Sequence, residues 1–476
     1  MANNLNDAGE KAHVAEIVYH GEKMILPEGL AIKDAIDLLK RRQDFLEKEV
    51  QLMETFDVFP WDGANAIDEV LTRKFGWSSA TATPGFFGPN PPKLISIEID
   101  HNKTKQVPWG AFSLPGVDGL LHTSVDRKDG RVVFQLVAEV KRKDEATIKK
   151  IFEEVREYLK SNSIYKGKAI KMRFLDDDGD PLQMPEPKFM DTSAISEDMV
   201  IYPQDVQTQI NINLFTPIKR VRDCLANRIP IKRGVLLGGT YGTGKTLAAT
   251  VASRIAVDNG ITYVYVPRAD ELSHAIGFAQ QNQSPACVIF CEDIDRSLSG
   301  ERTTEMDDIL NVIDGIDTKS TNVIVVLTTN DLNAINPAML RPGRLDAVIE
   351  VLPPDAKAVE KLLRLYGGSA IEPGTDLTKA GQSLAGEIPA VISEVVKRAK
   401  LAQLSLQEPG VPVTKLSEAA LVASAESMAK QLKLLKDRSA VKPRETSDVE
   451  DALAAVFAKA MGSTKEQIDT IHSKVC

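Results

Sequence analysis

The chain has 476 residues, of which 43% are hydrophobic and 26% are charged. This composition is ordinary for folded globular protein and excludes a largely disordered chain, and at ~150 residues per domain the length predicts about two to four domains. The formal net charge of −9 argues against a broad nucleic-acid-binding surface. No apolar run approaches the ~20 residues of a membrane span, and Met1–Glu16 lacks the apolar core of a signal peptide, so we expect a cytoplasmic protein without a membrane segment.

The sequence of residues 1–195 predicts a domain that contains both helices and strands. Apolar residues at helical or strand spacing alternate there with a stretch dense in glycine, proline and aromatic residues. The predicted elements are a helix at Ala31–Met53, an irregular loop at Phe75–Pro92, strands at Leu94–Ile99 and Val132–Val140, and a helix at Glu145–Leu159. We therefore expect an α+β domain, but the pattern does not identify its fold.

A linker-like stretch at Met184–Asp198 precedes a change of pattern, after which strands alternate with helices. The strands are almost continuously apolar, as expected when helices cover both faces of a parallel sheet. Strands are predicted at Gly234–Leu237, Thr262–Val266, Cys287–Cys291 and Val323–Leu327, and helices begin at Lys245 and Ala269. We expect an α/β core at 196–354, a small helical domain at 355–440 and a C-terminal helical extension at 441–476.

A phosphate-binding loop follows the first of these strands. Residues 239–246 read Gly-Thr-Tyr-Gly-Thr-Gly-Lys-Thr, which fits the pattern G-x-x-x-x-G-K-[ST]. Glycines let backbone N–H groups curl around a phosphate, and the following helix presents its N-terminus to the same charge. Lys245 would reach the β- and γ-phosphates, and the Thr246 hydroxyl would bind Mg²⁺. The alternative, a chance glycine turn, does not explain the strand before and the helix after. The residues expected to contact ATP are Gly239, Thr240, Tyr241, Gly242, Thr243, Gly244, Lys245, Thr246 and Leu247.

A pair of acids ends the third predicted strand, where Val-Ile-Phe-Cys leads into Glu292 and Asp293. In a P-loop enzyme one such acid holds Mg²⁺, usually through water, and the next polarises the attacking water. The alternative is a solvated strand end that has no chemical role.

Further motifs resemble those of the AAA family of ATPases, within the wider AAA+ group. Thr328–Asn330 is similar to the family's sensor 1, and Asn333–Asp346 is similar to its second region of homology, with Arg341 and Arg344 where arginine fingers lie. Leu384–Ile388 is similar to the lid segment that packs near the nucleotide, which puts Gly386 by the adenine or ribose. The resemblance covers Asp198 to Leu435. It implies a P-loop parallel-sheet core with a helical lid, ATP and Mg²⁺ as cofactors, and a homo-oligomeric ring that is usually a hexamer.

The chain departs from the family pattern at its acid pair and at its pore. The usual order is Asp then Glu, whereas Glu292 precedes Asp293 here. Glu292 is then expected on the Mg²⁺ side and Asp293 on the water side, one methylene short, which predicts slow hydrolysis. The segment after Thr262–Val266 is too short for a full pore loop plus a helix. Ala275–Gly277 either imitates the pore motif or forms part of a helix face, and the helix face is the favoured interpretation.

The leading hypothesis is an ATPase ring that remodels or disassembles a protein partner without threading it fully through the pore. The N-terminal domain would select that partner. Two alternatives remain open: a nucleotide-gated scaffold with weak hydrolysis, and a DNA-directed motor or loader, which the acidic net charge and short loops disfavour.

Overall fold

The computed structural model describes residues 14–19, 22–27, 30–83, 85–86, 88–128, 131–182, 184–294, 322–334, 345–408 and 410–439. The chain forms two compact units. The core unit comprises residues 1–200, 208–240 and 245–350, and the lid unit comprises residues 201–207, 241–244 and 351–476. Among the described residues, no helix combines the length and the apolar character that crossing a membrane requires.

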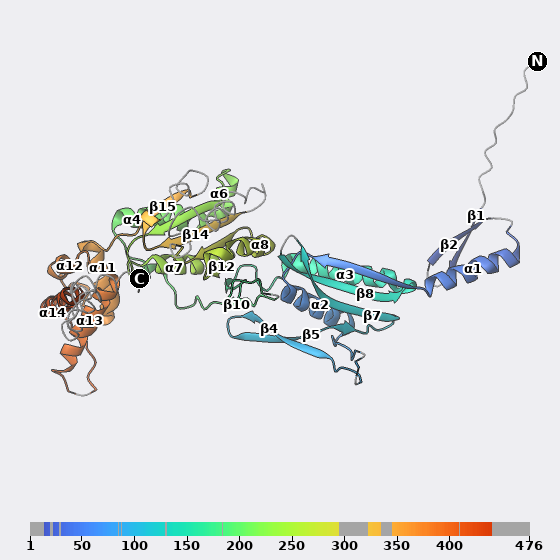
Figure 1. Ribbon diagram of the computed structural model, residues 1–476, viewed down its shortest axis with the longest axis horizontal. Helices are drawn as coiled ribbons and strands as arrows, with labels where there is room; N and C mark the ends of the chain where they lie inside the picture. Colours follow the sequence, from blue (N-terminus) through green and yellow to red (C-terminus); the bar gives the residue numbers. More distant parts are fainter. Residues whose placement is uncertain are drawn as a thin grey trace, which may run out of the picture. The chain divides into compact units, whose positions relative to one another are not determined.

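The N-terminal region of the core unit is α+β, as expected. It contains an antiparallel sheet in the order β3-β8-β7-β6, against which α2 and α3 pack (Figure 1). The buried side chains between them include Ile67, Phe134, Leu136 and Ile151. The elements are β1 (Val14–Tyr19), β2 (Glu22–Pro27), α1 (Ile32–Leu46), β3 (Glu49–Phe56), α2 (Pro60–Phe75), β4 (Lys93–Asp100), β5 (Lys103–Trp109), β6 (Ala111–Phe112), β7 (Gly119–Lys128), β8 (Arg131–Lys141) and α3 (Glu145–Ser161).

The predicted helix at Ala31–Met53 is wrong in its last third. The helix α1 ends at Leu46, and Glu49–Phe56 is a strand that pairs along its whole length with Phe134–Lys141 of β8. Its burial alternates from residue to residue, as the period of a strand requires. Cross-strand pairing therefore decides the structure of this segment. The strands and the helix predicted between Leu94 and Leu159 are confirmed.

The nucleotide-binding part of the core unit is a mostly parallel sheet in the order β10-β9-β12-β13-β14-β11-β15. Adjacent side chains of β13, such as Val288 and Ile289, are equally buried, so both faces of this strand are covered, as its continuous apolar sequence predicts. The strands are β9 (Ala169–Lys171), β10 (Lys188–Phe189), β11 (Arg233–Gly238), β12 (Thr262–Val266), β13 (Cys287–Cys291), β14 (Val323–Thr329) and β15 (Ala347–Glu350). The two edge strands β9 and β10 precede residue 196, so the sheet extends across the boundary that the sequence suggests.

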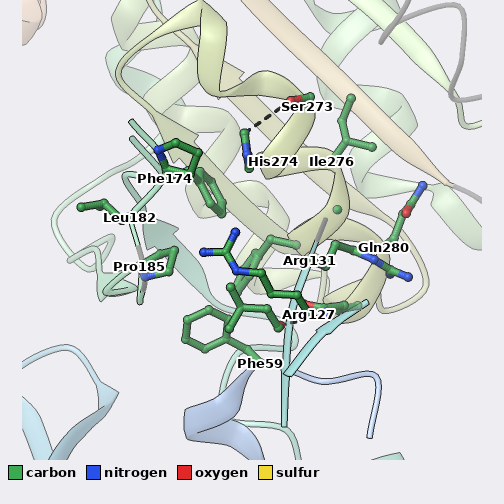
Figure 2. Close-up of a pocket in the computed structure, with 15 residues that line it drawn as sticks. Phe59, Arg127, Arg131, Phe174, Leu182, Pro185, Ser273, His274, Ile276 and Gln280 are labelled. Carbon is green, nitrogen blue, oxygen red and sulfur yellow. Dashed lines mark hydrogen bonds between the residues drawn. The ribbon is translucent and has the colours of Figure 1, made fainter. Parts of the chain in front are cut away.

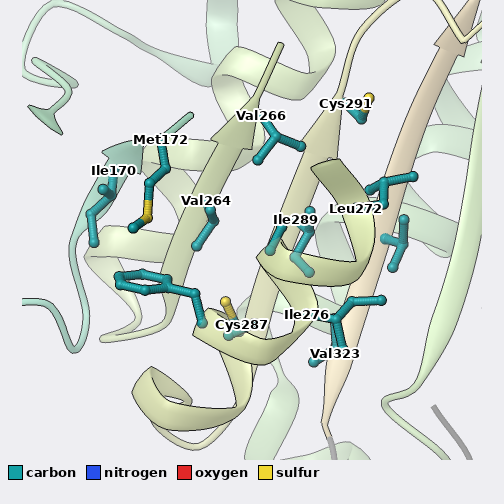
Figure 3. Close-up of a cluster of buried hydrophobic side chains, with 14 of the residues drawn as sticks. Ile170, Met172, Val264, Val266, Leu272, Ile276, Cys287, Ile289, Cys291 and Val323 are labelled. Atoms are coloured by element: carbon teal, nitrogen blue, oxygen red, sulfur yellow. The ribbon is translucent and has the colours of Figure 1, made fainter. Parts of the chain in front are cut away.

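Helices connect and cover these strands. The buried cluster in Figure 3 shows Leu272 and Ile276 of α8 lying over the strands, beside Val264 and Ile289. The described helices are α4 (Gln204–Ile210), a π-helical turn (Asn211–Phe215), α5 (Thr216–Lys219), α6 (Val221–Ala226), α7 (Lys245–Asp258), a 3-10 turn (Ala269–Glu271) and α8 (Leu272–Asn282). Ala275–Gly277 lies inside α8 and is buried, so these residues form a helix face.

The helix α8 also joins the sheet to the N-terminal region. The rings of Phe278, Phe59 and Tyr165 contact one another with centroids 5.6–5.7 Å apart. The stem of Arg131 lies so close to Gly277 that a methyl group there would come within 2.8 Å of Cγ. We call this contact of α8 with Phe59, Arg131 and Tyr165 the α8 joint. Because the α8 joint is closely packed, it fixes the N-terminal region to the nucleotide-binding part of the core unit.

The lid unit is helical over most of its described length after Asp355, as the sequence predicts. Its core consists of aliphatic residues, among them Val359, Leu362, Ile392 and Val396. The elements are α11 (Ala356–Gly367), a 3-10 turn (Gly368–Ala370), α12 (Thr378–Leu384), α13 (Pro389–Leu404) and α14 (Glu418–Ser439). The predicted C-terminal extension at 441–476 lies outside the described residues.

Candidate nucleotide site

The phosphate loop has the expected strand–loop–helix context. The strand β11 ends at Gly238 and the helix α7 begins at Lys245. Gly242 and Gly244 have φ angles of +80° and +101°, a left-handed conformation that favours glycine. Within the lid unit, the Tyr202 hydroxyl donates to the Gly244 carbonyl at 2.6 Å, and a Cβ on Gly242 would come within 2.8 Å of Ile388. Both glycines are therefore required by the backbone.

Lys245 is buried at the foot of this loop. Its side-chain nitrogen donates to the carbonyls of Gly239 at 2.6 Å and Thr240 at 3.0 Å, and to Oδ1 of Asn330 at 2.9 Å. All three acceptors are neutral oxygens. A phosphate oxygen is a stronger acceptor because it is charged, so this ammonium can exchange a neutral partner for an anionic one.

Asp293 and Asn330 meet at the carboxyl edge of the sheet. They follow the parallel neighbours β13 and β14, whose ends lie side by side. The Asn330 amide donates to Oδ1 of Asp293 at 2.9 Å, and the Asp293 N–H donates to the Thr328 hydroxyl at 3.1 Å. Asp293 has φ of +47°, which is unusual for a residue with a side chain. These hydrogen bonds hold that strained conformation, and they connect Lys245 to Asp293 through Asn330.

Glu292 faces a different partner. The Tyr265 hydroxyl of the neighbouring strand β12 donates to its Oε2 at 2.9 Å. Burial raises the pKa of Tyr265 well above its ordinary value and the charge of Glu292 raises it further, so the phenol stays protonated and remains a donor. The ammonium of Lys171, on β9, lies 5.2 Å from the centre of the Tyr265 ring.

Tyr265 and Lys171 are site neighbours that the sequence analysis missed. Tyr265 carries a polar group within an apolar strand that lies beside the acid-bearing strand, and that signal could have identified it. Lys171 had no comparable signal, because the three residues of β9 are too few to show a period.

The structure joins Lys245, Asn330 and Asp293 by hydrogen bonds, with Glu292 adjacent in the chain. Thr246 and Leu247 lie in the first turn of α7. Gly386 belongs to the lid unit, where its N–H donates to the Pro354 carbonyl at 2.9 Å, and its position beside a nucleotide stays a prediction. Arg341 and Arg344 lie outside the described residues.

Comparison with known proteins agrees with these motifs. A family model described as "ATPase family associated with various cellular activities (AAA)" matches residues 235–352. The chain is 30% identical over 254 residues to an ATP-dependent zinc metalloprotease FtsH of Rhodococcus erythropolis, which covers 49% of this chain and 28% of the relative. It is 32% identical over 197 residues to the FtsH of Caldicellulosiruptor bescii (37% and 31%). It is 30% identical over 223 residues to a cell division cycle protein 48 homolog of Archaeoglobus fulgidus (43% and 30%). The chain thus spans less than a third of the length of these relatives.

Proposed function

Since the chain belongs to the AAA family of ATPases through its residues 235–352, we propose that it hydrolyses ATP in order to remodel or disassemble a protein partner. The observation that carries the proposal is the hydrogen-bonded series from Lys245 through Asn330 to Asp293. This series joins the Lys245 ammonium and the Asp293 carboxylate on one network at the carboxyl edge of parallel strands, which supports phosphate binding by the first and a general-base role for the second.

Each residue of this network has a distinct part. Lys245 binds the β- and γ-phosphates in place of the neutral oxygens that it now contacts, which frees the Asn330 side chain to orient the attacking water. Asp293 accepts the proton of that water as general base. The bond from Asn330 fixes the Asp293 carboxylate, because positioning matters as much as basicity for this step.

The residues present fit Mg²⁺ at this site. The Thr246 hydroxyl and the Glu292 carboxylate supply the hard oxygen donors that this ion prefers. When bound, Mg²⁺ neutralises charge on the phosphates. The hydrogen bond from Tyr265 holds the Glu292 side chain in place.

We further propose that Arg341 and Arg344 complete the site of a neighbouring copy in a ring, for which a hexamer is the usual form in this family. An arginine supplied in this way commonly raises the rate by ~10³–10⁵. The N-terminal region would select the protein partner.

The first experiment measures ATP turnover per subunit, with Mg²⁺, over a wide range of protein concentration. We expect the specific rate to rise and then saturate, because the active site is completed by a second copy. The Arg344→Ala protein is the control: it should bind ATP but show no rise. A specific rate that is measurable yet independent of concentration would contradict an active site shared between subunits.

One observation favours a second function. The base of this site is an aspartate, one methylene shorter than the usual glutamate. If nucleotide binds and the ring assembles while turnover stays near zero at every concentration, the same experiment favours a nucleotide-gated scaffold.

A further inference from the structure

The core unit contains a cavity of about 400 Å³ beside the α8 joint, away from the residues of the nucleotide site. One side is formed by α8 and the segment around Phe174, and the other by Phe59 and the end of the β7–β8 hairpin (Figure 2). Its volume falls within the range of ~300–1,000 Å³ that is typical of small-molecule sites.

Arg127 supplies an unused positive charge to this cavity. In Figure 2 its guanidinium lies between the Phe174 and His274 rings on one side and Phe59 on the other. Among the residues that the structure describes, this guanidinium makes no hydrogen bond or ion pair. Arg131, four positions later, differs because it pairs with Asp57 at 3.4 Å and packs on Gly277. A guanidinium has five donors arranged to match a carboxylate or a phosphate, so Arg127 is suited to an anion.

Flat rings form the wall next to Arg127. Phe174 and His274 are stacked with centroids 5.8 Å apart and planes inclined by 25°. Burial lowers the pKa of His274, and the charge of Arg127 lowers it further. The imidazole is therefore neutral near pH 7 and adds no second charge. Such a wall favours a planar apolar group, because aromatic rings pack on one another with offset faces.

We propose that this cavity binds a small organic anion that consists of a flat ring bearing a phosphate or a carboxylate. The anionic group pairs with Arg127, and the ring lies against Phe174 and His274. The ligand would contact α8, whose following strand β13 leads to Glu292 and Asp293. The site is separate from the ATP site, and the inference does not depend on the proposed function.

The test uses phenyl phosphate and benzoate as probes, which distinguish the two anionic groups. Binding is measured by ligand-detected NMR titration of the full chain carrying Lys245→Ala, so that the phosphate loop does not bind the probe. We expect saturable binding of at least one probe with Kd on the order of 1 mM, as suits ligands of this size. Inorganic phosphate and benzyl alcohol, which carry the charge or the ring alone, should bind at least ~10-fold more weakly.

Arg127→Gln added to this protein should weaken probe binding by ~10-fold or more, because it removes the charge and keeps the length. Lys128→Gln is the matched control, since adjacent strand residues point to opposite faces and Lys128 does not line the cavity. Thermal unfolding of both variants checks that they remain folded. The proposal is overturned if neither probe binds saturably, or if Arg127→Gln binds as well as Lys128→Gln. In the chain that keeps Lys245, Arg127→Gln should leave basal ATP turnover unchanged. Failure of the cavity proposal can therefore be distinguished from failure of the proposed ATPase function.

Discussion

The carboxyl edge of the sheet around Lys245, Asn330 and Asp293, which we call the phosphate end, and the α8 joint are held together in opposite ways, although α8 packs on β13, the strand that leads to Asp293. At the phosphate end, polar side chains contact one another through hydrogen bonds of 2.9 Å, from Lys245 to Asn330 and from Asn330 to Asp293. At the joint, the contacts are between aromatic rings and between Arg131 and a glycine. At the phosphate end, water or a ligand can replace a hydrogen-bond partner. At the joint, removal of a side chain leaves its neighbours without packing contacts.

This difference predicts which mutations should lower ATP turnover and which should lower the stability of the fold. Asp293 and Asn330 are partly exposed, so water can replace a hydrogen-bond partner that is removed, and little folding free energy is lost. A close-packed aromatic cluster has no such substitute, and a deletion leaves a cavity. Substitutions of Asp293 or Asn330 should therefore reduce turnover with little effect on folding, and substitutions at the joint should do the reverse.

The largest effect is expected from Lys245→Ala. It removes the cation that we propose binds the phosphates, so ATP turnover should fall by ~10³-fold or more, with ATP binding strongly weakened. The measurement is steady-state phosphate release together with nucleotide titration. Lys33→Ala, an exposed lysine on α1, is the control and should behave as the parent chain. Tight ATP binding by Lys245→Ala would contradict the assignment of the phosphate loop.

Phe278→Ala should break the joint. The side chain is 3% exposed and contacts Phe59 and Tyr165, so its loss should lower the free energy of unfolding by about 3–5 kcal/mol. Urea unfolding followed by far-UV circular dichroism measures this change. Phe86→Ala is the matched control, because Phe86 is 95% exposed and its loss should change stability by less than about 0.5 kcal/mol. Equal stability of the two variants would contradict the claim that packing at the joint stabilises the fold.

Asp293→Asn tests the division of labour between the two acids. Asparagine keeps an oxygen for the Asn330 amide but cannot accept a proton from water, so turnover should fall on the order of 10²-fold while ATP binding persists. Glu292→Gln should instead raise the Mg²⁺ concentration needed for half-maximal turnover. If Asp293→Asn turned over normally, the base would have to be another residue.

Lys245, Asn330 and Asp293, which the sequence singled out, meet in the structure for a physical reason. The loop glycines, Lys245 and the acid pair stand in short contiguous segments, where local backbone requirements and charge dictate residue type. Sheet order then brings Asn330 to Asp293 without further information, because the two strands are parallel neighbours. The contact of Tyr265 with Glu292 was missed because predicting it requires knowing that β12 and β13 are neighbours in the sheet.

The N-terminal region was predicted less well because its structure depends on distant pairing. The segment Glu49–Phe56 is a strand because it pairs with β8, about 80 residues later in the chain. The strands β9 and β10, of three and two residues, exist only as additions to the edge of the sheet. No local pattern can predict such additions.

A pH-dependent effect is expected from a buried acid near the joint, Asp62. It is 1% exposed, and its Oδ1 accepts the N–H of Ile164 at 2.9 Å. Burial raises its pKa from 3.8 to about 6, against the opposing effect of hydrogen bonds from Ser163 and Ile164. The folded state therefore binds this proton more tightly than the unfolded state. The stability that results is fully present below pH ~4 and is lost as the pH rises through about 6, in total by up to about 3 kcal/mol.

Asp62→Asn should flatten that part of the stability profile. Asparagine keeps the oxygen that accepts from Ile164 but does not titrate, so between pH 4 and pH 7 the variant should gain up to about 3 kcal/mol relative to the parent. Urea unfolding at several pH values across this range measures the gain. Asp37→Asn on α1, where the aspartate is exposed, makes the same change of charge without burial and should follow the parent profile. Parallel profiles for Asp62→Asn and Asp37→Asn would mean that Asp62 titrates in the folded chain as it does in water, and that the joint admits solvent. A gain confined to Asp62→Asn would instead show that packing near the joint keeps a carboxyl group away from water, whereas Glu292 and Asp293 at the phosphate end are partly exposed.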